Sequence, residues 1–216
     1  MKNRLYLLIL FIGLVSYSTI SAQLQLGFHA DAGVSNFIEK NREPNVEIAN
    51  NYTSLFSYSL GVSTSYPIVS DWLRINSGAK YAQLRAMNNM PKDMPFPGNT
   101  PSSWEEQYHT LQIPIKVDYA FEKWLHFNLG LSNKINLNTP KNTQTEKINK
   151  YALAFIGGFD FIFYDKFILG ASYYKDLTPN SLIYKNYKET NETYDIGYYV
   201  QQCTINIGYL LDFNRK

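Results

Sequence analysis

The amino-acid sequence predicts an all-β fold, an eight-stranded antiparallel up-and-down transmembrane β-barrel. Three observations lead to this prediction. Eight segments alternate apolar and polar residues with a period of two, which is typical of strands with two different faces. Long polar connections alternate with short ones along the chain, and bulky aromatic residues flank every short connection.

The first 22 residues have the features of a secretory signal peptide. Lys2 and Arg4 form a basic start, residues 5–15 form an apolar run, and small residues lead up to Ala22. A helix that crosses a bilayer needs about 20 apolar residues, and this run has roughly half that length. We therefore expect cleavage after Ala22, export, and a mature barrel domain of residues 23–216.

Composition excludes some classes of function. Lys2 and Arg4 leave with the signal peptide, so the 20 basic residues become 18 and equal the 18 acidic ones. A chain without net charge gives no reason to expect a nucleic-acid partner. The chain has one cysteine, Cys203, which cannot form an internal disulfide, and we expect it to be an apolar-facing strand residue.

The first three predicted strands are residues 24–35, 55–67 and 72–84. In the first, Phe28 shares a face with the other apolar residues and Asp31 lies on the opposite face. A helix would not keep this parity over the whole segment, so the pattern favours a strand.

Five more strands are predicted downstream: residues 111–121, 125–132, 151–163, 167–177 and 198–213. Four of them alternate clearly, with apolar residues at every second position. The segment 167–177 is less regular.

The connections give the barrel a direction. Residues 36–54, 86–108, 133–150 and 178–196 are long and polar, whereas the connections near 68–71, 122–123 and 164–166 are short. Outer-membrane barrels have short periplasmic turns and long external loops. The aromatic residues near the short turns are expected at the membrane interface; they are Tyr66, Trp72, Phe121, Trp124, Phe163, Phe167 and Phe213.

A barrel of eight strands has an interior just wide enough to be filled by side chains. Parity directs several charged residues into this lumen, where charges need partners. The predicted network consists of Asp31, Arg74, Lys80, Lys116, Asp118 and Asp160. We expect the three bases to pair with the three acids and to plug the lumen.

The connection 86–108 is the most unusual of the loops. Four prolines prevent a regular helix or strand there. Exposed apolar groups on a stiff loop can mark a partner site, and packing over the barrel mouth is the other interpretation. The residues concerned are Met90, Met94, Phe96 and Trp104.

Several motifs resemble the PorT-like outer-membrane β-barrel family. Residues 111–115 (LQIPI) resemble its "L-x-I-P" strand, the segment 26–35 resembles its first strand, and residues 155–160 (FIGGFD) resemble its Gly-rich sixth strand. Residues 173–178 (YYKDLT) resemble its "Y-x-x-G-L-T" element, with Asp176 where Gly is usual. The resemblance implies a barrel in the outer membrane and brings no catalytic residues.

The leading functional hypothesis is a non-enzymatic outer-membrane protein with a structural or partner-interaction role through its external loops. Its expected partners are outer-membrane lipid and a protein at these loops, and no cofactor or metal is expected. One alternative is a narrow transporter or channel for ions or small solutes. Another is a rim-located hydrolase or acyltransferase, for which His109 with Glu105 and Glu106 nearby is the candidate base.

Overall fold

The structure is a computed structural model that describes residues 25–41, 51–69, 72–89, 103–138, 147–187 and 192–212. The expected signal peptide, residues 1–22, lies outside these ranges. Within them, no helix is long and apolar enough to cross a membrane. The strands are β1 (Gln25–Asn41), β2 (Asn51–Val69), β3 (Leu73–Asn89), β4 (Ser103–Glu122), β5 (Leu125–Asn136), β6 (Lys147–Ile148), β7 (Tyr151–Phe163), β8 (Phe167–Asp176), β9 (Ser181–Tyr187) and β10 (Glu192–Asp212).

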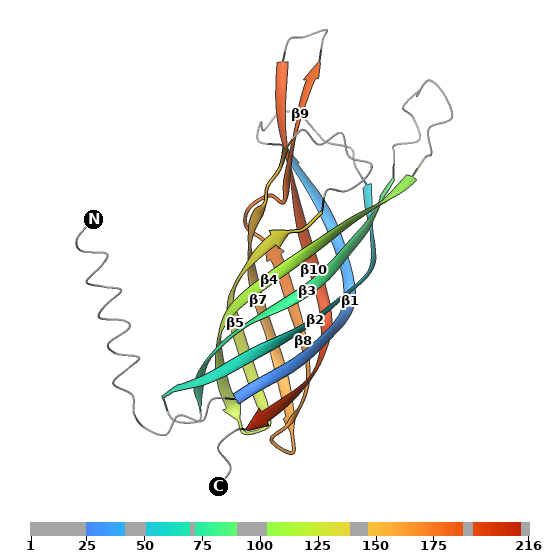
Figure 1. Cartoon of the computed structure of the whole chain (residues 1–216). Coiled ribbons are helices and arrows are strands. Elements are labelled where there is room, and N and C mark those ends of the chain that lie inside the picture. Colours follow the sequence, from blue (N-terminus) through green and yellow to red (C-terminus); the bar gives the residue numbers. More distant parts are fainter. Residues whose placement is uncertain are drawn as a thin grey trace, which may run out of the picture.

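Eight of these strands form a closed antiparallel barrel, which confirms the predicted fold class (Figure 1). Their order around the barrel is β1-β2-β3-β4-β5-β7-β8-β10, and β10 pairs with β1 from Gln25–Asp212 to Asn41–Ile196. The remaining two strands lie beyond the barrel wall. β9 forms a hairpin with β10, and β6 pairs with the base of β9.

Alternate side chains along each strand face opposite sides of the wall, as the period of two requires. On the outer side, Leu60 and Ile115 are each 58% exposed and Ile207 is 63% exposed. On the inner side, Asp31 and Asn206 are buried. The outer face therefore presents an apolar band, and the inner face is mostly polar.

Strand β8 alternates as regularly as its neighbours, although its sequence did not show this. Ile168 and Tyr174 are buried inside the barrel, whereas Phe167, Leu169 and Tyr173 are exposed outside. Both faces of β8 are thus apolar in places, and the contrast of polarity that marks a strand in a sequence is lost.

The strands continue well into the predicted external loops, so the predicted loop boundaries are wrong. β1 reaches Asn41, β2 starts at Asn51, β3 reaches Asn89 and β4 starts at Ser103. Further strand structure, in β6, β9 and the start of β10, lies in the segments 133–150 and 178–196.

The physical reason is an inversion of polarity near the external end. In β3, the inner side changes from Lys80 to the buried Ala82, Leu84 and Ala86, while Arg85 lies on the outer side. The alternation continues with apolar residues inside and polar residues outside, as in a water-soluble β protein. A prediction that requires apolar residues on the outer face ends the strand at this inversion, although the strand itself continues.

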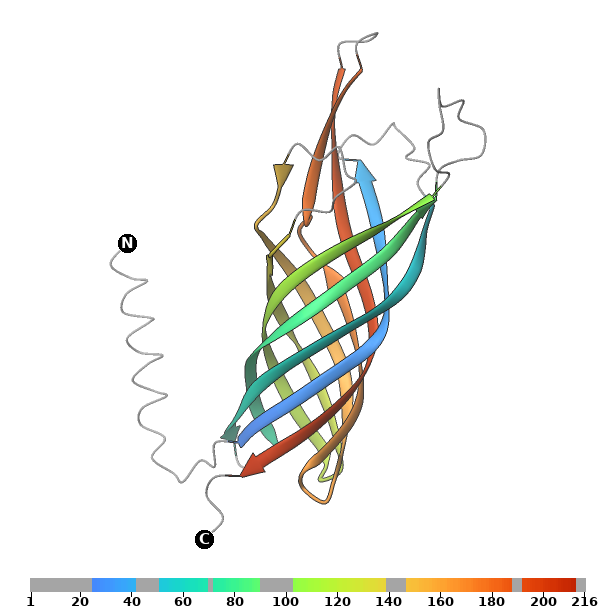
Figure 2. The ribbon, with the colours of Figure 1, turned by 45° about the vertical axis from the view of Figure 1, so that its right-hand side comes forward.

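The external end divides into two sheets (Figure 2). The ladder between β1 and β2 ends at Ser35–Leu55, and that between β4 and β5 ends at Thr110–Asn136. Beyond these points β2, β3 and β4 continue as one sheet. β1, β10 and β9 continue as the other.

A hydrophobic cluster, here called the mouth cluster, joins the two sheets. It consists of Phe37, Ala82, Leu84, Ala86, Tyr108 and Val200, with Tyr52 packed against it. The rings of Phe37 and Tyr108 meet edge to face with their centroids 5.2 Å apart. The external end of the lumen is therefore filled by side chains from both sheets.

The turn between β7 and β8 was predicted at residues 164–166. Tyr164 and Asp165 have φ of 52° and 58°, and the Lys166 N–H donates to the carbonyl oxygen of Phe163 at 3.1 Å. Positive φ at both central residues is the geometry of a type I′ hairpin turn, whose twist matches that of the strands.

Two adjacent glycines of β7 provide a test of the inner and outer faces. A Cβ at Gly158 would lie 2.4 Å from the carbonyl oxygen of Ala171, whereas one at Gly157 would lie 3.4 Å from the Phe155 ring. We expect Gly158→Ala to lower the free energy of unfolding by about 2 kcal/mol. Gly157→Ala should change it by less than about 0.5 kcal/mol. Urea titration in detergent micelles measures both, and equal effects would contradict the assignment of faces.

Candidate functional site

A polar chamber lies inside the barrel, in the half nearer the short turns. Its volume is about 70 Å³, which is room for a few water molecules. The wall brings together eight acidic, basic and histidine side chains: His29, Asp31, Arg74, Lys80, Lys116, Asp118, His126 and Asp160.

Lys80 is the centre of the strongest contacts in the chamber. Its Nζ lies 2.7 Å from Asp31 Oδ2 and donates to the Tyr174 hydroxyl at 2.5 Å. The ammonium also lies 4.4 Å from the centroid of the Tyr174 ring. Ser59 donates a further hydrogen bond to Asp31 at 2.5 Å. The long lysine side chain thus connects β3 with β1 and with β8 on the far wall.

The other two acids do not pair with Arg74 and Lys116, so this part of the predicted network is wrong. Asp118 Oδ2 lies 2.9 Å from His126 Nδ1. Asp160 accepts hydrogen bonds from the amides of Asn128 at 2.8 Å and Asn206 at 2.6 Å. An aspartate side chain is too short to cross the lumen, so each acid binds polar groups on nearby strands.

The two remaining bases have other surroundings. Arg74 donates to the Gln25 amide oxygen at 2.7 Å. Lys116 forms no ion pair with the side chains that the structure describes. Lys116 and His29 both line the chamber, and His29 Nε2 lies 2.5 Å from the Ser63 hydroxyl.

An ion pair that the sequence analysis missed closes the chamber from the external side. Lys134 Nζ lies 2.5 Å from Asp176 Oδ1, and both side chains are 0% exposed. The Asn180 amide and the Val200 backbone N–H donate to the second oxygen of Asp176. Lys134 fell in a predicted loop, although extending the inward parity of Ser132 by two residues would have identified it.

This ion pair and the mouth cluster lie next to each other at the external end of the lumen, and together they are here called the mouth seal. Val200 connects them, because its backbone binds Asp176 and its side chain belongs to the mouth cluster. The seal spans the lumen from β1 and β3 to β5 and β8.

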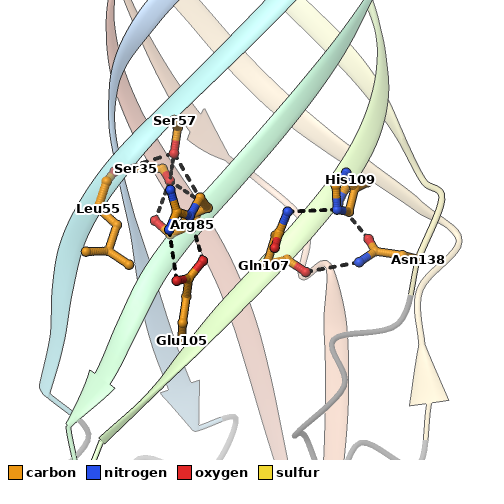
Figure 3. A network of polar contacts seen from close by, with 8 residues as sticks. All are labelled: Ser35, Leu55, Ser57, Arg85, Glu105, Gln107, His109 and Asn138. Carbon is orange, nitrogen blue, oxygen red and sulfur yellow. Dashed lines mark hydrogen bonds and ion pairs between the residues drawn. The ribbon is translucent and has the colours of Figure 1, made fainter.

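On the outer face, Arg85 of β3 and Glu105 of β4 lie beyond the apolar band and contact each other (Figure 3). Arg85 binds Glu105 through two hydrogen bonds, at 2.6 and 2.9 Å. The hydrogen bonds from Arg85 lower the pKa of the Glu105 carboxyl below its ordinary value. This pair is solvated, so its contribution to stability is small.

The acids expected beside His109 are not its partners. Its ring nitrogens lie at hydrogen-bond distance from the Tyr81 hydroxyl and the Gln107 amide, and its backbone N–H donates to Asn138 at 2.6 Å. Glu106, by contrast, is buried on the inner face. Parity therefore separates Glu106 from His109, whereas Glu105 shares the outer face with His109 but pairs with Arg85.

Acidic, cysteine and histidine side chains are common ligands of metal ions in proteins. Over the described ranges, no three such residues gather in a way that could hold a metal ion. Cys203 is exposed on the outer face of β10.

Six of the seven expected interface aromatics are described, and all lie near the short turns. Trp72, Phe121 and Trp124 are largely exposed on the outer side, as are Phe163 and Phe167. Tyr66 is half-buried on β2, and Phe213 lies outside the described residues.

The predicted loop surface has no described side chains. Met90, Met94 and Phe96 lie outside the described residues, and Trp104 is described only as part of strand β4.

Comparisons with known proteins show similarity at the level of the fold. No family model and no curated protein matches the sequence, so the PorT-like resemblance stays an expectation. The structure is similar to the outer membrane protein OprG from Pseudomonas aeruginosa, with a TM-score of 0.53 and 12% identity. The match covers 88% of this chain and 97% of OprG. This chain therefore shares the barrel fold of a small outer-membrane protein.

Two further barrels match with lower TM-scores. Ail of Yersinia pestis, in complex with sucrose octasulfate, has a TM-score of 0.45 and 14% identity, over 88% of this chain and 99% of that one. Neisserial surface protein A has a TM-score of 0.45 and 12% identity, over 85% and 96%.

The buried ion pair generates a prediction. Lys134→Met leaves Asp176 buried without its cation, so we expect a loss of about 3–5 kcal/mol in the free energy of unfolding. Adding Asp176→Asn should restore most of this loss, because the acceptor remains and the charge is removed. Lys175→Met, at an exposed neighbouring position, is the control and should have an effect within about 0.5 kcal/mol. Equal losses at positions 134 and 175, measured in urea, would show that the seal is unimportant.

Proposed function

We propose that the chain is an integral outer-membrane protein with a structural or partner-interaction role, and that it is not an enzyme. The apolar band supports the membrane location, since lipid-facing and lumen-facing residues alternate in outer-membrane barrels. The exposed aromatics near the short turns support an interface with lipid headgroups at that end. Residues 1–22 act, in this proposal, as the cleaved signal for export.

The mouth seal is the observation that supports a structural or partner-interaction role over the conduction of solutes. A conducting barrel needs a continuous aqueous path, and here apolar side chains and a fully buried ion pair fill the external end of the lumen. An eight-stranded barrel has little interior space to begin with. The chamber below the seal is a pocket with room for only a few water molecules.

The external side offers the working surface in this proposal. The sheet β2–β3–β4 carries polar side chains such as Arg85 and Glu105 on its outer face above the apolar band. The β9–β10 hairpin of the other sheet projects from the external end of the barrel (Figure 1). The segment between β3 and β4 contains Met90, Met94 and Phe96, which would add apolar contacts to this surface.

A narrow channel is the second candidate, because charged groups of both signs line the chamber. A gate in the mouth seal would be required. Bilayer recordings separate the two candidates.

In fractionated cells, the protein should sediment with the outer membranes. After purification, it should migrate differently on detergent gels with and without heating, and its mass should be that of a chain starting at Gln23. In planar bilayers it should give no large stable openings. A variant that removes the apolar part of the seal, Phe37→Ser/Leu84→Ser/Tyr108→Ser, should open a conductive path while retaining heat-modifiable migration. Large stable openings of the wild type would contradict the closed lumen, an equally silent variant would contradict the role of the mouth cluster in closing it, and a soluble periplasmic product would contradict the membrane location.

A deletion tests the interaction surface. Replacing residues 90–102 by a short Gly-Ser turn leaves β3 and β4 intact. We expect this variant to lose at least half of the proteins that crosslink to the wild type on intact cells, as counted by mass spectrometry. A matched change in the tight turn, Tyr164→Asn, should keep them all. An unchanged set of partners after the deletion would exclude this segment as the interaction surface.

A further inference from the structure

The external part of strand β4 is an edge of the sheet β2–β3–β4. β4 pairs with β3 as far as Ser103, but its ladder with β5 ends at Thr110–Asn136. Among the strands that the structure describes, none lies alongside β4 on this side beyond that point. Within lipid such an edge would leave backbone groups without partners, whereas above the apolar band water can bind them. The segment 103–107 is therefore an edge strand at the external end.

The hydrogen bonds of His109 show which residues direct their backbone groups toward this edge. Its carbonyl oxygen accepts from the Leu137 N–H at 2.8 Å, and its N–H donates to the Asn138 side chain at 2.6 Å, both on the β5 side. The backbone groups of an antiparallel strand point to opposite sides at successive residues. The odd-numbered residues of the segment 103–107 therefore also point to the free side, and the even-numbered residues point to β3.

The Asn138 side chain lies beside this edge as a peptide group of an added strand would (Figure 3). Its Oδ1 accepts from the His109 N–H, and its Nδ2 donates to the Gln107 carbonyl oxygen at 3.1 Å. A primary amide offers the donor and the acceptor that a backbone peptide group also offers. Beyond Asn138, the N–H and C=O of Glu105 have no hydrogen-bond partner among the described residues. The edge thus already binds one amide and has room for more.

The other gap between the two sheets is bridged by side chains. β1 and β2 separate above Ser35–Leu55, and Tyr52 of β2 reaches across to β1. Its ring centroid lies 5.8 Å from that of Phe37, and its hydroxyl donates to Glu39 Oε1 at 2.9 Å. On β4, by contrast, Glu105 pairs with Arg85 of its own sheet. The β4 edge is therefore the one that can accept a further strand.

We propose that an extended segment of a basic partner protein adds to the β4 edge at residues 103–107 and continues the sheet β2–β3–β4. Main-chain hydrogen bonds give strand addition its affinity. The edge segment, SWEEQ, has two acidic residues and no basic one, which favours Lys and Arg in the partner. A second copy of the chain fits less well, because two such edges would bring like charges together. This inference rests on the proposed interaction role of the external side and specifies its surface.

Amide hydrogen exchange, followed by NMR in zwitterionic micelles, tests whether the edge is free. The amides of Glu105 and Gln107 should exchange at least about tenfold faster than those of Glu106 and Tyr108, because the latter two point to β3. The even-numbered residues are thus controls within the same strand. Equal protection of all four amides would show that the edge is covered within the chain, and it would overturn the proposal.

Synthetic peptides test the chemistry of the partner. A peptide of alternating threonine and lysine should bind saturably and slow the exchange of the Glu105 and Gln107 amides. A peptide of alternating threonine and glutamate should bind at least about tenfold more weakly. The lysine peptide N-methylated throughout keeps its charge but loses its N–H donors, so its binding should also fall at least about tenfold. Absence of binding by the lysine peptide, or equal binding of any two of the three, would overturn the proposal.

Two variants at one position separate the backbone from the side chain. Glu105→Thr removes the carboxylate and keeps the N–H, whereas Glu105→Pro also removes an N–H that does not bond to β3. The proline variant should bind the lysine peptide at least about tenfold more weakly than the threonine variant. Heat-modifiable migration verifies that both have folded, and equal binding by the two would overturn the proposal. Partners lost on deletion of residues 90–102 would still support the proposed function in that case.

Discussion

The hydrogen-bonded closure of β10 onto β1 is the constraint on which the rest of the structure depends. Each backbone group without a partner in a lipid environment costs several kcal/mol, so a sheet placed there needs to close on itself. The continuous ladder from Gln25–Asp212 to Asn41–Ile196 leaves neither strand with a free edge along the barrel wall. Closure also divides the side chains into an inner and an outer set, and the two sets follow different chemical rules.

Within the apolar band, the inner set is polar and confined, so its contacts are short and specific. Long side chains such as Lys80 reach across the lumen, whereas the aspartates bind groups on nearby strands. Gly158 shows the same confinement at the wall, because the backbone of β8 approaches it too closely for a Cβ. The lumen is consequently a packed interior with a small chamber.

Above the apolar band the polarity of the inner and outer faces is reversed, and this reversal determines how the external end packs. Water surrounds the outer face there, so polar residues such as Arg85 and Glu105 move outside and apolar ones such as Leu84 move inside. The mouth cluster is the core of a small two-sheet assembly on top of the barrel. The same inversion that lets the strands extend beyond the band also fills the external end of the lumen with apolar side chains.

The sequence by itself determined the number of barrel strands, the face of most residues within the band outside β8, and the end that carries the short turns. Those features follow from local alternation, because successive side chains of a strand point to opposite faces and the pattern is therefore visible among neighbouring residues. Only the tertiary structure decided which lumen charges meet, that Lys134 and Asp176 form a buried pair, and that the strands extend past Ser35 and Leu84. Contacts across the lumen depend on the tilt and stagger of strands far apart in the sequence, and the inversion of polarity depends on where the surrounding solvent changes. Neither quantity is encoded in the spacing of neighbouring residues.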